Sequence, residues 1–232
     1  MHDVAVRSIG VRVRSLAVGA ALLAGAANVL TGAWAVPDAW AAPGTCPDVD
    51  VVFARGTGEP PGIGRVGQAM VDALTGMLAG RTLTAYGVDY PASVNFLHTA
   101  EGANDAAAHI ADMAVQCPAT QVVLGGYSQG AAVVSMLAGV PPVGDRIGSI
   151  GSAPPLPAAS AARVAAVTVF GNPAARFGTP LSTTGMFAGR AMDLCRAGDP
   201  ICSPGGRDRE AHREYEFPPY SDQAAIFAAG LL

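Results

Sequence analysis

Runs of apolar residues alternate with polar, glycine-rich and proline-rich stretches beyond the first forty residues. Short runs rich in β-branched residues predict buried parallel strands. Apolar residues spaced three and four apart predict amphipathic helices between them. The expected strands are 49–54, 83–90, 120–125, 164–170 and 189–194, and the expected helices are 66–79, one capped by Asn104, 129–138 and one capped by Ser221.

Strands that alternate with helices imply parallel pairing, with helices on both faces of the sheet. Residues 141–163 are rich in Pro, Gly, Ser and Ala and are expected to form a loop. No repeat or linker divides the chain, so residues 42–232 are predicted to form one doubly wound α/β domain.

The first forty residues have a different pattern. Three arginines precede an uncharged apolar run over residues 16–36, and residues 39–41 form a small-x-small cleavage site. This order is typical of a secretory signal peptide, so we expect residues 1–41 to be removed and the protein to be secreted. The alternative is a retained membrane anchor, because the run is about long enough to cross a bilayer.

Composition narrows the class of protein. Half of the 232 residues are hydrophobic and 14% are charged, which excludes a disordered chain. The net charge of −4 argues against a nucleic-acid partner, since such proteins present a basic surface.

Four cysteines follow the leader: Cys46, Cys117, Cys195 and Cys202. An even number in an exported chain predicts two disulfides, and three pairings are possible. Proximity favours a bridge within the last pair, which would leave the first pair to join the start of the domain to the end of a helix. A zinc site is disfavoured because no C-x-x-C pair is present.

The segment Gly126-Tyr127-Ser128-Gln129-Gly130 matches the G-x-S-x-G nucleophile elbow. An apolar strand leads into it and a helical run leaves it, which is the context that such an elbow requires. The following helix directs its positive end to the place where an oxyanion would form. The pattern favours Ser128 as a nucleophile over an ordinary turn residue.

A serine nucleophile needs a base, and three histidines follow the leader. His109 is expected to be a solvated helix residue. His98 precedes Ser128, against the order serine, acid, histidine of the α/β-hydrolases. His212 is therefore the predicted base.

Five acidic residues lie between the serine and His212: Asp145, Asp193, Asp199, Asp208 and Glu210. The last two are so near the histidine in sequence that they are expected to be solvated loop charges. Asp199 lies between two cysteines, where a disulfide would hold its carboxylate rigidly. Asp193, at the end of the last expected strand, is the competing choice.

Four segments, in this order, resemble the cutinases, specifically the exported cutinase-like esterases of actinobacteria. They are FARGTGEPPGIGRVG at 53–67, LGGYSQGA at 124–131, CRAGDPIC at 195–202, and the H-x-x-Y pair His212 and Tyr215. The resemblance extends from about Cys46 to the C-terminus.

The resemblance implies a lidless α/β-hydrolase with a five-stranded parallel sheet. It implies a catalytic triad of Ser128, Asp199 and His212. It also implies an oxyanion hole made by the backbone N–H of Gln129 together with Thr57, where fungal members have serine.

The resemblance further implies the disulfides Cys46–Cys117 and Cys195–Cys202. The loops 92–103 and 173–188 differ from fungal patterns and are expected to border the acyl site. Four side chains could form an apolar rim there: Phe96, Leu97, Phe177 and Phe187.

We therefore expect a secreted serine esterase that cleaves short- to medium-chain acyl esters through an acyl-enzyme. It would be a monomer, without metal or organic cofactor, that contacts lipid surfaces transiently. Alternatives on the same scaffold are an acetylxylan esterase, a phospholipase or an acyltransferase. An inactive cell-envelope binding protein is disfavoured, because it would need no complete set of serine, acid and histidine.

Overall fold

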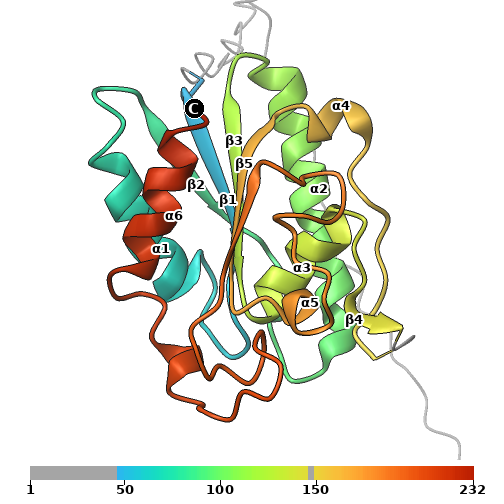
Figure 1. Ribbon diagram of the computed structural model, residues 1–232. Helices are drawn as coiled ribbons and strands as arrows, with labels where there is room; N and C mark the ends of the chain where they lie inside the picture. The colour runs from blue at the N-terminus through green and yellow to red at the C-terminus, as the bar shows by residue number, and fades with distance from the viewer. Residues whose placement is uncertain (1–45, 146–148) are drawn as a thin grey trace, which may run out of the picture. The chain divides into compact units, whose positions relative to one another are not determined.

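The computed structural model describes residues 46–145 and 149–232 (Figure 1). Five strands form one sheet in the order β2-β1-β3-β5-β6, and every neighbouring pair is parallel. The strands are β1 (Val49–Ala54), β2 (Leu83–Gly87), β3 (Gln121–Tyr127), β5 (Val164–Phe170) and β6 (Ala191–Leu194). The predicted doubly wound α/β class is confirmed, and the expected leader, residues 1–41, lies outside the described residues.

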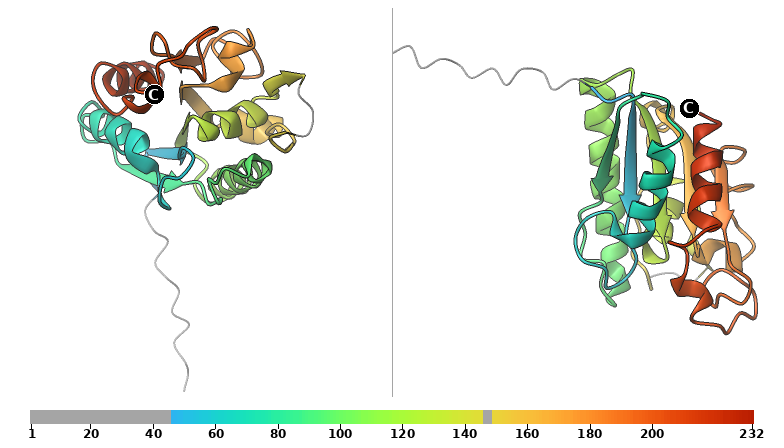
Figure 2. Two further views of the ribbon diagram at one scale, coloured as in Figure 1. Left: turned by 90° about the horizontal axis from the view of Figure 1, so that it is seen from below. Right: turned by 90° about the vertical axis from the view of Figure 1, so that its left-hand side faces the viewer.

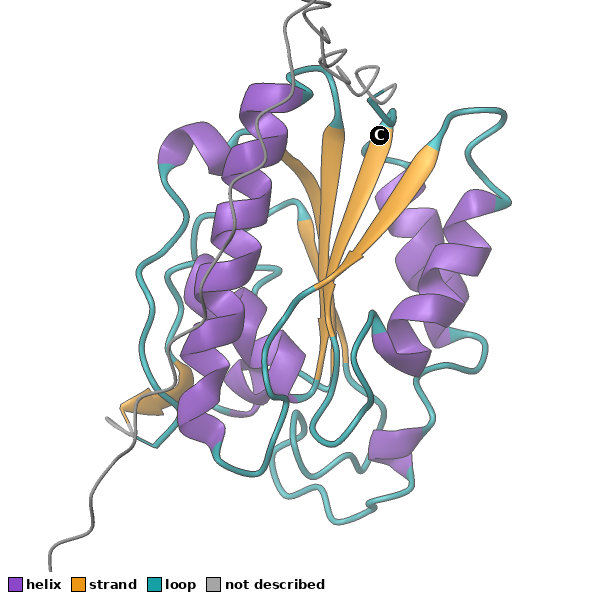
Figure 3. Ribbon diagram, turned by 180° about the vertical axis from the view of Figure 1, so that it is seen from behind, coloured by secondary structure: helices purple, strands orange, loops and turns teal. Residues whose placement is uncertain are grey.

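Helices cover both faces of the sheet (Figures 2 and 3). Phe53 and Phe170 turn to one face, while Val52 and Leu124 turn to the other, and all four are fully buried. The first face packs on α1 (Gly64–Thr75) and α6 (Tyr220–Ala229), and the second on α2 (Thr99–Gln116) and α3 (Gln129–Leu137). Alternating side chains thus bury both sides of each central strand.

Smaller elements lie in the connections. They are η1 (Phe96–His98), β4 (Pro142–Asp145), α4 (Ala158–Ala161), α5 (Pro173–Arg176) and η2 (Ala211–Arg213). The segment expected to be one loop, 141–163, therefore contains a short strand and a helical turn. Neither is long enough to leave a periodic pattern in the sequence.

Two predicted helix caps were wrong. Asn104 lies inside α2, because packing of Gly102 and Ala103 against the core extends the helix back to Thr99. Ser221 is a buried residue of the first turn of α6, which begins at Tyr220. Tertiary burial outweighs the local capping preference at both ends.

Two predicted elements end early. α1 stops at Thr75 although the apolar spacing continues to Leu78, and positive φ angles at Ala79 and Gly80 turn the chain away. β2 stops at Gly87, where a Cβ atom would lie 2.4 Å from the backbone of residue 62. Leu78 is nevertheless buried, so its apolar character reflects packing beyond the helix.

The five strands of the sheet run in the same direction, so their carboxyl ends lie together, at the lower end of Figure 1. The chain leaves β1 toward β2 on one side, whereas β3 pairs with β1 on the other side. The loop after β1 and the loop after β3 therefore run in opposite directions, which leaves a crevice between them at the carboxyl ends of the strands. Open α/β sheets bind ligands in such a crevice.

Both expected disulfides are present. Cys46 is bonded to Cys117, directly after α2, with 5.4 Å between their Cα atoms. Cys195 is bonded to Cys202 with a corresponding distance of 5.8 Å, closing the loop after β6. In the part of the chain that the structure describes, no helix is both long and apolar enough to span a bilayer.

The two disulfides are expected to stabilise the domain unequally. They close segments with sequence separations of 71 and 7 residues. Loop entropy then predicts losses of about 4 kcal/mol for Cys46→Ser with Cys117→Ser and about 2 kcal/mol for Cys195→Ser with Cys202→Ser. Urea unfolding of both double variants measures this, and a larger loss at the short loop would contradict the entropic account.

Candidate active site

Ser128 occupies a sharp turn between β3 and α3, with φ 56° and ψ −112°. A positive φ at a non-glycine residue costs about 1–3 kcal/mol and persists only where its surroundings enforce it. A Cβ atom on Gly126 would lie 2.3 Å from the carbonyl oxygen of Gly130, and one on Gly130 would lie 1.9 Å from that of Ala54. Both glycines of the elbow are therefore sterically required.

The structure brings Ser128, His212 and Asp199 into one hydrogen-bonded chain. His212 Nε2 lies 2.8 Å from Ser128 Oγ, and His212 Nδ1 lies 2.8 Å from Asp199 Oδ2. An ionised carboxylate only accepts hydrogen bonds, so Nδ1 carries the proton and Nε2 is left to accept from the serine hydroxyl. This is the arrangement that a general base requires.

Asp199 is completely buried, which by itself would raise the pKa of its carboxyl group. Hydrogen bonds outweigh this effect and hold the pKa below its ordinary value. Besides His212, the donors are the hydroxyl of Tyr215 at 2.6 Å and the backbone N–H of Ile201 at 2.7 Å. The carboxylate therefore stays ionised inside the protein.

Tyr215 contacts the same carboxylate oxygen as the histidine does. Its ring is fully buried, and its hydroxyl also accepts a hydrogen bond from the N–H of Arg196. Burial, and then the bond to Asp199, raise the pKa of this phenol, so it remains a donor. The sequence marked Tyr215 only as part of a motif and indicated no role for it.

Gly171 lies beside this pair, with a φ of +57°. A Cβ atom here would lie 2.9 Å from His212 Nδ1 and 3.1 Å from Asp199 Oδ2. The sequence indicated only a turn at this place, because the contact joins segments far apart in the chain.

The described competing acids have other partners. Asp193 accepts hydrogen bonds from the amide of Asn172 and the backbone N–H of Ser182. Asp208 accepts from backbone N–H groups of its own loop, and Glu210 forms an exposed ion pair. Each therefore has partners other than the imidazole of His212.

The two other histidines do not approach the serine. His98 pairs with Glu101 at 2.6 Å. The expectation that His109 is solvated was wrong: its ring stacks on Tyr86 and its Nε2 lies 2.7 Å from the buried Asp50. A buried carboxylate needs such a partner, which explains why this helix position turns inward.

The two predicted oxyanion residues contact each other. Thr57 Oγ1 donates to Gln129 Oε1 at 2.9 Å, and Gln129 Nε2 donates to Thr99 Oγ1 at 3.1 Å. The amide side chain thus holds the loop after β1 against the first residue of α3. Thr57 and Gln129 consequently lie on one side of Ser128, where both line the same cleft.

Arg55 fixes the loop that bears Thr57. Its buried guanidinium donates to the carbonyl oxygens of Glu59, Val88 and Tyr90. These bonds attach the loop after β1 to the segment after β2. The position of Thr57 is therefore set by the sheet rather than by the loop alone.

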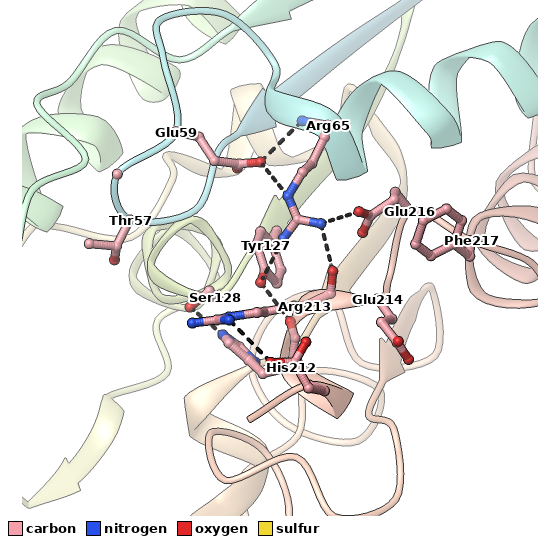
Figure 4. Close-up of a pocket in the computed structure, with 12 residues that line it drawn as sticks. Thr57, Glu59, Arg65, Tyr127, Ser128, His212, Arg213, Glu214, Glu216 and Phe217 are labelled. Carbon is pink, nitrogen blue, oxygen red and sulfur yellow. Dashed lines mark hydrogen bonds and ion pairs between the residues drawn. The ribbon is translucent and has the colours of Figure 1, made fainter. Parts of the chain in front are cut away.

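Arg65, in the first turn of α1, connects this loop to the segment around His212 (Figure 4). Its guanidinium lies 3.4 Å from a carboxylate oxygen of Glu59, donates to the carbonyl of Arg213 at 2.6 Å and pairs with Glu216. Sequence patterns did not identify this residue, because its partners are distant in the chain.

Tyr127 completes the connection beside the serine. Its hydroxyl donates to the carbonyl oxygen of His212 at 2.6 Å and accepts from Arg65 at 3.3 Å. Burial is the main reason that the pKa of Tyr127 is raised to about 12, so the phenol stays protonated. The residue before the predicted nucleophile is thereby bonded to the backbone of the predicted base itself.

Two clefts open on either side of Ser128. One encloses about 420 Å³, and its lining is largely apolar, with Phe96, Ala132 and Ile150 among its side chains. The other encloses about 720 Å³, and six of its twelve lining residues are charged. The expected rim residue Phe187 belongs to neither, since it is fully buried in the core.

The remaining rim candidates, Phe96, Leu97 and Phe177, are 44%, 53% and 41% exposed. Only Phe96 lines the apolar cleft directly. Within 46–145 and 149–232, no group of His, Cys, Asp and Glu side chains has the spacing of a metal site.

Two mycobacterial proteins are similar to this chain in sequence. "Probable carboxylesterase Culp3" of Mycobacterium tuberculosis is 53% identical over 184 residues, which cover 78% of this chain and 68% of that protein. "Phospholipase Culp4" of the same species is 50% identical over 185 residues, covering 79% and 78%.

Solved structures agree. The catalytic core of acetyl xylan esterase from Trichoderma reesei superposes with a TM-score of 0.68 at 27% identity, covering 81% of this chain and all of that one. A Trichoderma reesei cutinase bound to a phosphonate inhibitor gives a TM-score of 0.62 at 35% identity, covering 80% and 77%. The family model described as cutinase matches residues 45–232, and the chain therefore belongs to the cutinase family.

Proposed function

We propose that this member of the family is a secreted serine esterase that cleaves short- to medium-chain acyl esters through Ser128, His212 and Asp199. The observation that supports this most directly is the hydrogen-bonded chain from the buried carboxylate to the strained serine. The relatives named carboxylesterase and phospholipase support the same class of reaction.

In acylation, Ser128 Oγ attacks the ester carbonyl while His212 Nε2 takes its proton. Asp199 holds the imidazole in the required tautomer and stabilises the imidazolium that forms. The negative oxygen of the tetrahedral intermediate is bound by the backbone N–H of Gln129 together with Thr57, at the positive end of α3.

Collapse of this intermediate breaks the bond to the alcohol oxygen, which receives the proton from His212. Water then attacks the acyl-enzyme, with His212 again acting as base, and the acid is released. Every proton moves between Ser128, His212, water and substrate, while Asp199 remains ionised.

The apolar cleft supports the preference for a hydrocarbon acyl chain. A volume of about 420 Å³ is at the lower end of the usual range for small-molecule sites. It favours short and medium chains over long ones. The leader pattern and the two disulfides support export to an oxidising compartment.

Ser128→Ala is expected to abolish hydrolysis of p-nitrophenyl butyrate, because the substitution removes the attacking oxygen. Labelling by a fluorophosphonate should disappear as well, with an unchanged circular dichroism spectrum. Ser182→Ala, which alters a serine outside both clefts, is the control and should retain activity. Turnover near that of the wild type in the Ser128 variant would refute the assignment.

Tyr215→Phe tests how far catalysis depends on the second donor to Asp199. A hydrogen bond to a charged group contributes about 1.5–3 kcal/mol, so we expect kcat to fall roughly 10- to 100-fold with little change in KM. The pKa of Asp199 should rise with the loss of a donor, so the acid limb of the activity profile should move to higher pH.

Tyr220→Phe is the matched control for that variant. Its ring packs on Tyr215, with 5.3 Å between ring centroids, and this contact survives the loss of the hydroxyl. An equal loss of kcat in both variants would mean that aromatic packing, and not the bond to Asp199, supports catalysis.

Arg65→Met tests the connection between the oxyanion loop and the segment around His212. The variant leaves Glu59 and Glu216 without their cation, and we expect kcat to fall by about tenfold or more, since loss of a charged partner costs about 1–3 kcal/mol. Arg81→Met, at the opposite end of the sheet, where Arg81 contacts Gln121, is the control. Steady-state kinetics with p-nitrophenyl butyrate compare the two, and unchanged kcat in the Arg65 variant would contradict the role.

A further inference from the structure

The two clefts beside Ser128 share only three lining residues: Thr57, Ser128 and His212. An ester bound with its carbonyl at Ser128 has two arms, the acyl chain and the alcohol, which point away from each other. Because the clefts meet only at the reacting atoms, each arm has a cleft of its own.

The chemistry of the linings decides which arm enters which cleft. A fatty acyl chain has no polar atoms, so among charged side chains it would strip water from them without returning hydrogen bonds. It fits the cleft of Phe96, Ala132 and Ile150. The alcohol arm is left to the charged cleft, next to the imidazole that must protonate the departing oxygen.

We propose that the charged cleft is a subsite for the alcohol arm and that it selects uncharged alcohols with several hydroxyl groups, such as glycerol or a sugar. The proposal rests on the proposed function and adds the identity of the leaving group. At that step the C–O bond to the alcohol breaks, the electron pair stays on the alcohol oxygen, and His212 supplies the proton.

The cleft is rich in hydrogen-bond acceptors. Four carboxylates line it, from Glu59, Glu210, Glu214 and Glu216, against the guanidinium groups of two arginines, Arg65 and Arg213. Free hydroxyl groups on the alcohol arm can donate to such carboxylates, whereas the alkyl arm of an ester such as hexyl butyrate has no donor. Because Arg196 pairs with Glu214, these four carboxylates face three guanidinium groups, and a phosphate-bearing alcohol would meet a net negative charge.

The arginines of the cleft are already engaged. Arg65 is held by Glu59, Glu216 and the carbonyl of Arg213, and Arg213 pairs with Glu210. In contrast, Glu216 Oε2 is the one buried side-chain oxygen or nitrogen without a hydrogen-bond partner in the described part of the chain. That atom has almost no contact with solvent, so a substrate hydroxyl does not reach it directly. The carboxylates that the cleft presents to a substrate are those of Glu210 and Glu214, whose side chains are 70% and 39% exposed.

Phe217 gives the cleft an apolar surface as well. Its side chain is 57% exposed and lines the same wall as Glu216 (Figure 4). A polyol has both C–H and O–H groups, so an aromatic ring beside carboxylates matches both kinds of surface.

The test compares three butyrate esters that differ only in the alcohol: glycerol 1-monobutyrate, hexyl butyrate and 1-butyryl-glycerol 3-phosphate. We expect kcat/KM for the glycerol ester to exceed that of each of the other two by about tenfold, in the range that binding sites achieve for such differences. Equal or higher values for the hexyl ester or the phosphate ester would overturn the proposal.

Two variants, one in each cleft, test whether the preference for the glycerol ester arises in the charged cleft. Glu210→Leu with Glu214→Leu makes the outer wall of the charged cleft apolar and should lower the ratio of glycerol to hexyl ester by about threefold or more. Phe96→Ala, in the other cleft, should change the preferred acyl length and leave that ratio unchanged. A ratio that is unaltered in the double variant, or that moves equally in both, would refute the subsite.

Hydrolysis of p-nitrophenyl butyrate tests the esterase function separately from the subsite, because its activated leaving group depends little on alcohol binding. If it is hydrolysed with dependence on Ser128 but the alcohols are not distinguished, the subsite is wrong and the esterase function stands. If no ester is hydrolysed, the proposed function is wrong and the subsite with it.

Discussion

The buried carboxylate of Asp199 is the constraint on which the site depends. An ionised group without exposure to water is tolerated only if donors surround it. Three donors from two segments surround it: the imidazole of His212 and the phenol of Tyr215 from one, and the backbone N–H of Ile201 from the other. The hydrogen bonds that stabilise this one carboxylate thus fix the orientation of the histidine and hold the disulfide-closed loop around the acid. They also hold the segment of His212 and Tyr215 against the carboxyl ends of the strands.

Much of this arrangement could be predicted from local sequence. The strands before and after the elbow are continuous apolar runs, and the glycines at 126 and 130 fall where no Cβ atom fits. His212 followed by elimination, because only three histidines lie beyond the leader. The choice of Asp199 over Asp193 did not follow from local pattern, and it required the resemblance of the loop between two cysteines.

The features of the site that could not be predicted from the sequence depend on contacts between residues far apart in the chain. Gly171 resembles any turn glycine until His212 is placed against it, and Arg65 resembles any exposed helix residue until Glu216 reaches it. The inward turn of His109 likewise depends on Asp50, which is far away in the chain. Helix ends were misjudged for the same reason, since burial of neighbouring residues decided where α2 and α6 begin.

The separation of the two clefts also bears on the order of events in catalysis. In the mechanism that we propose, the charged cleft is open to solvent once the alcohol has left, while the acyl chain still fills the apolar one. The second nucleophile enters through the space that the first product vacated, and it reaches the imidazole from the same direction. A cleft lined by charged side chains stays hydrated, which keeps water beside the imidazole for the second attack, at a concentration far above that of any released alcohol.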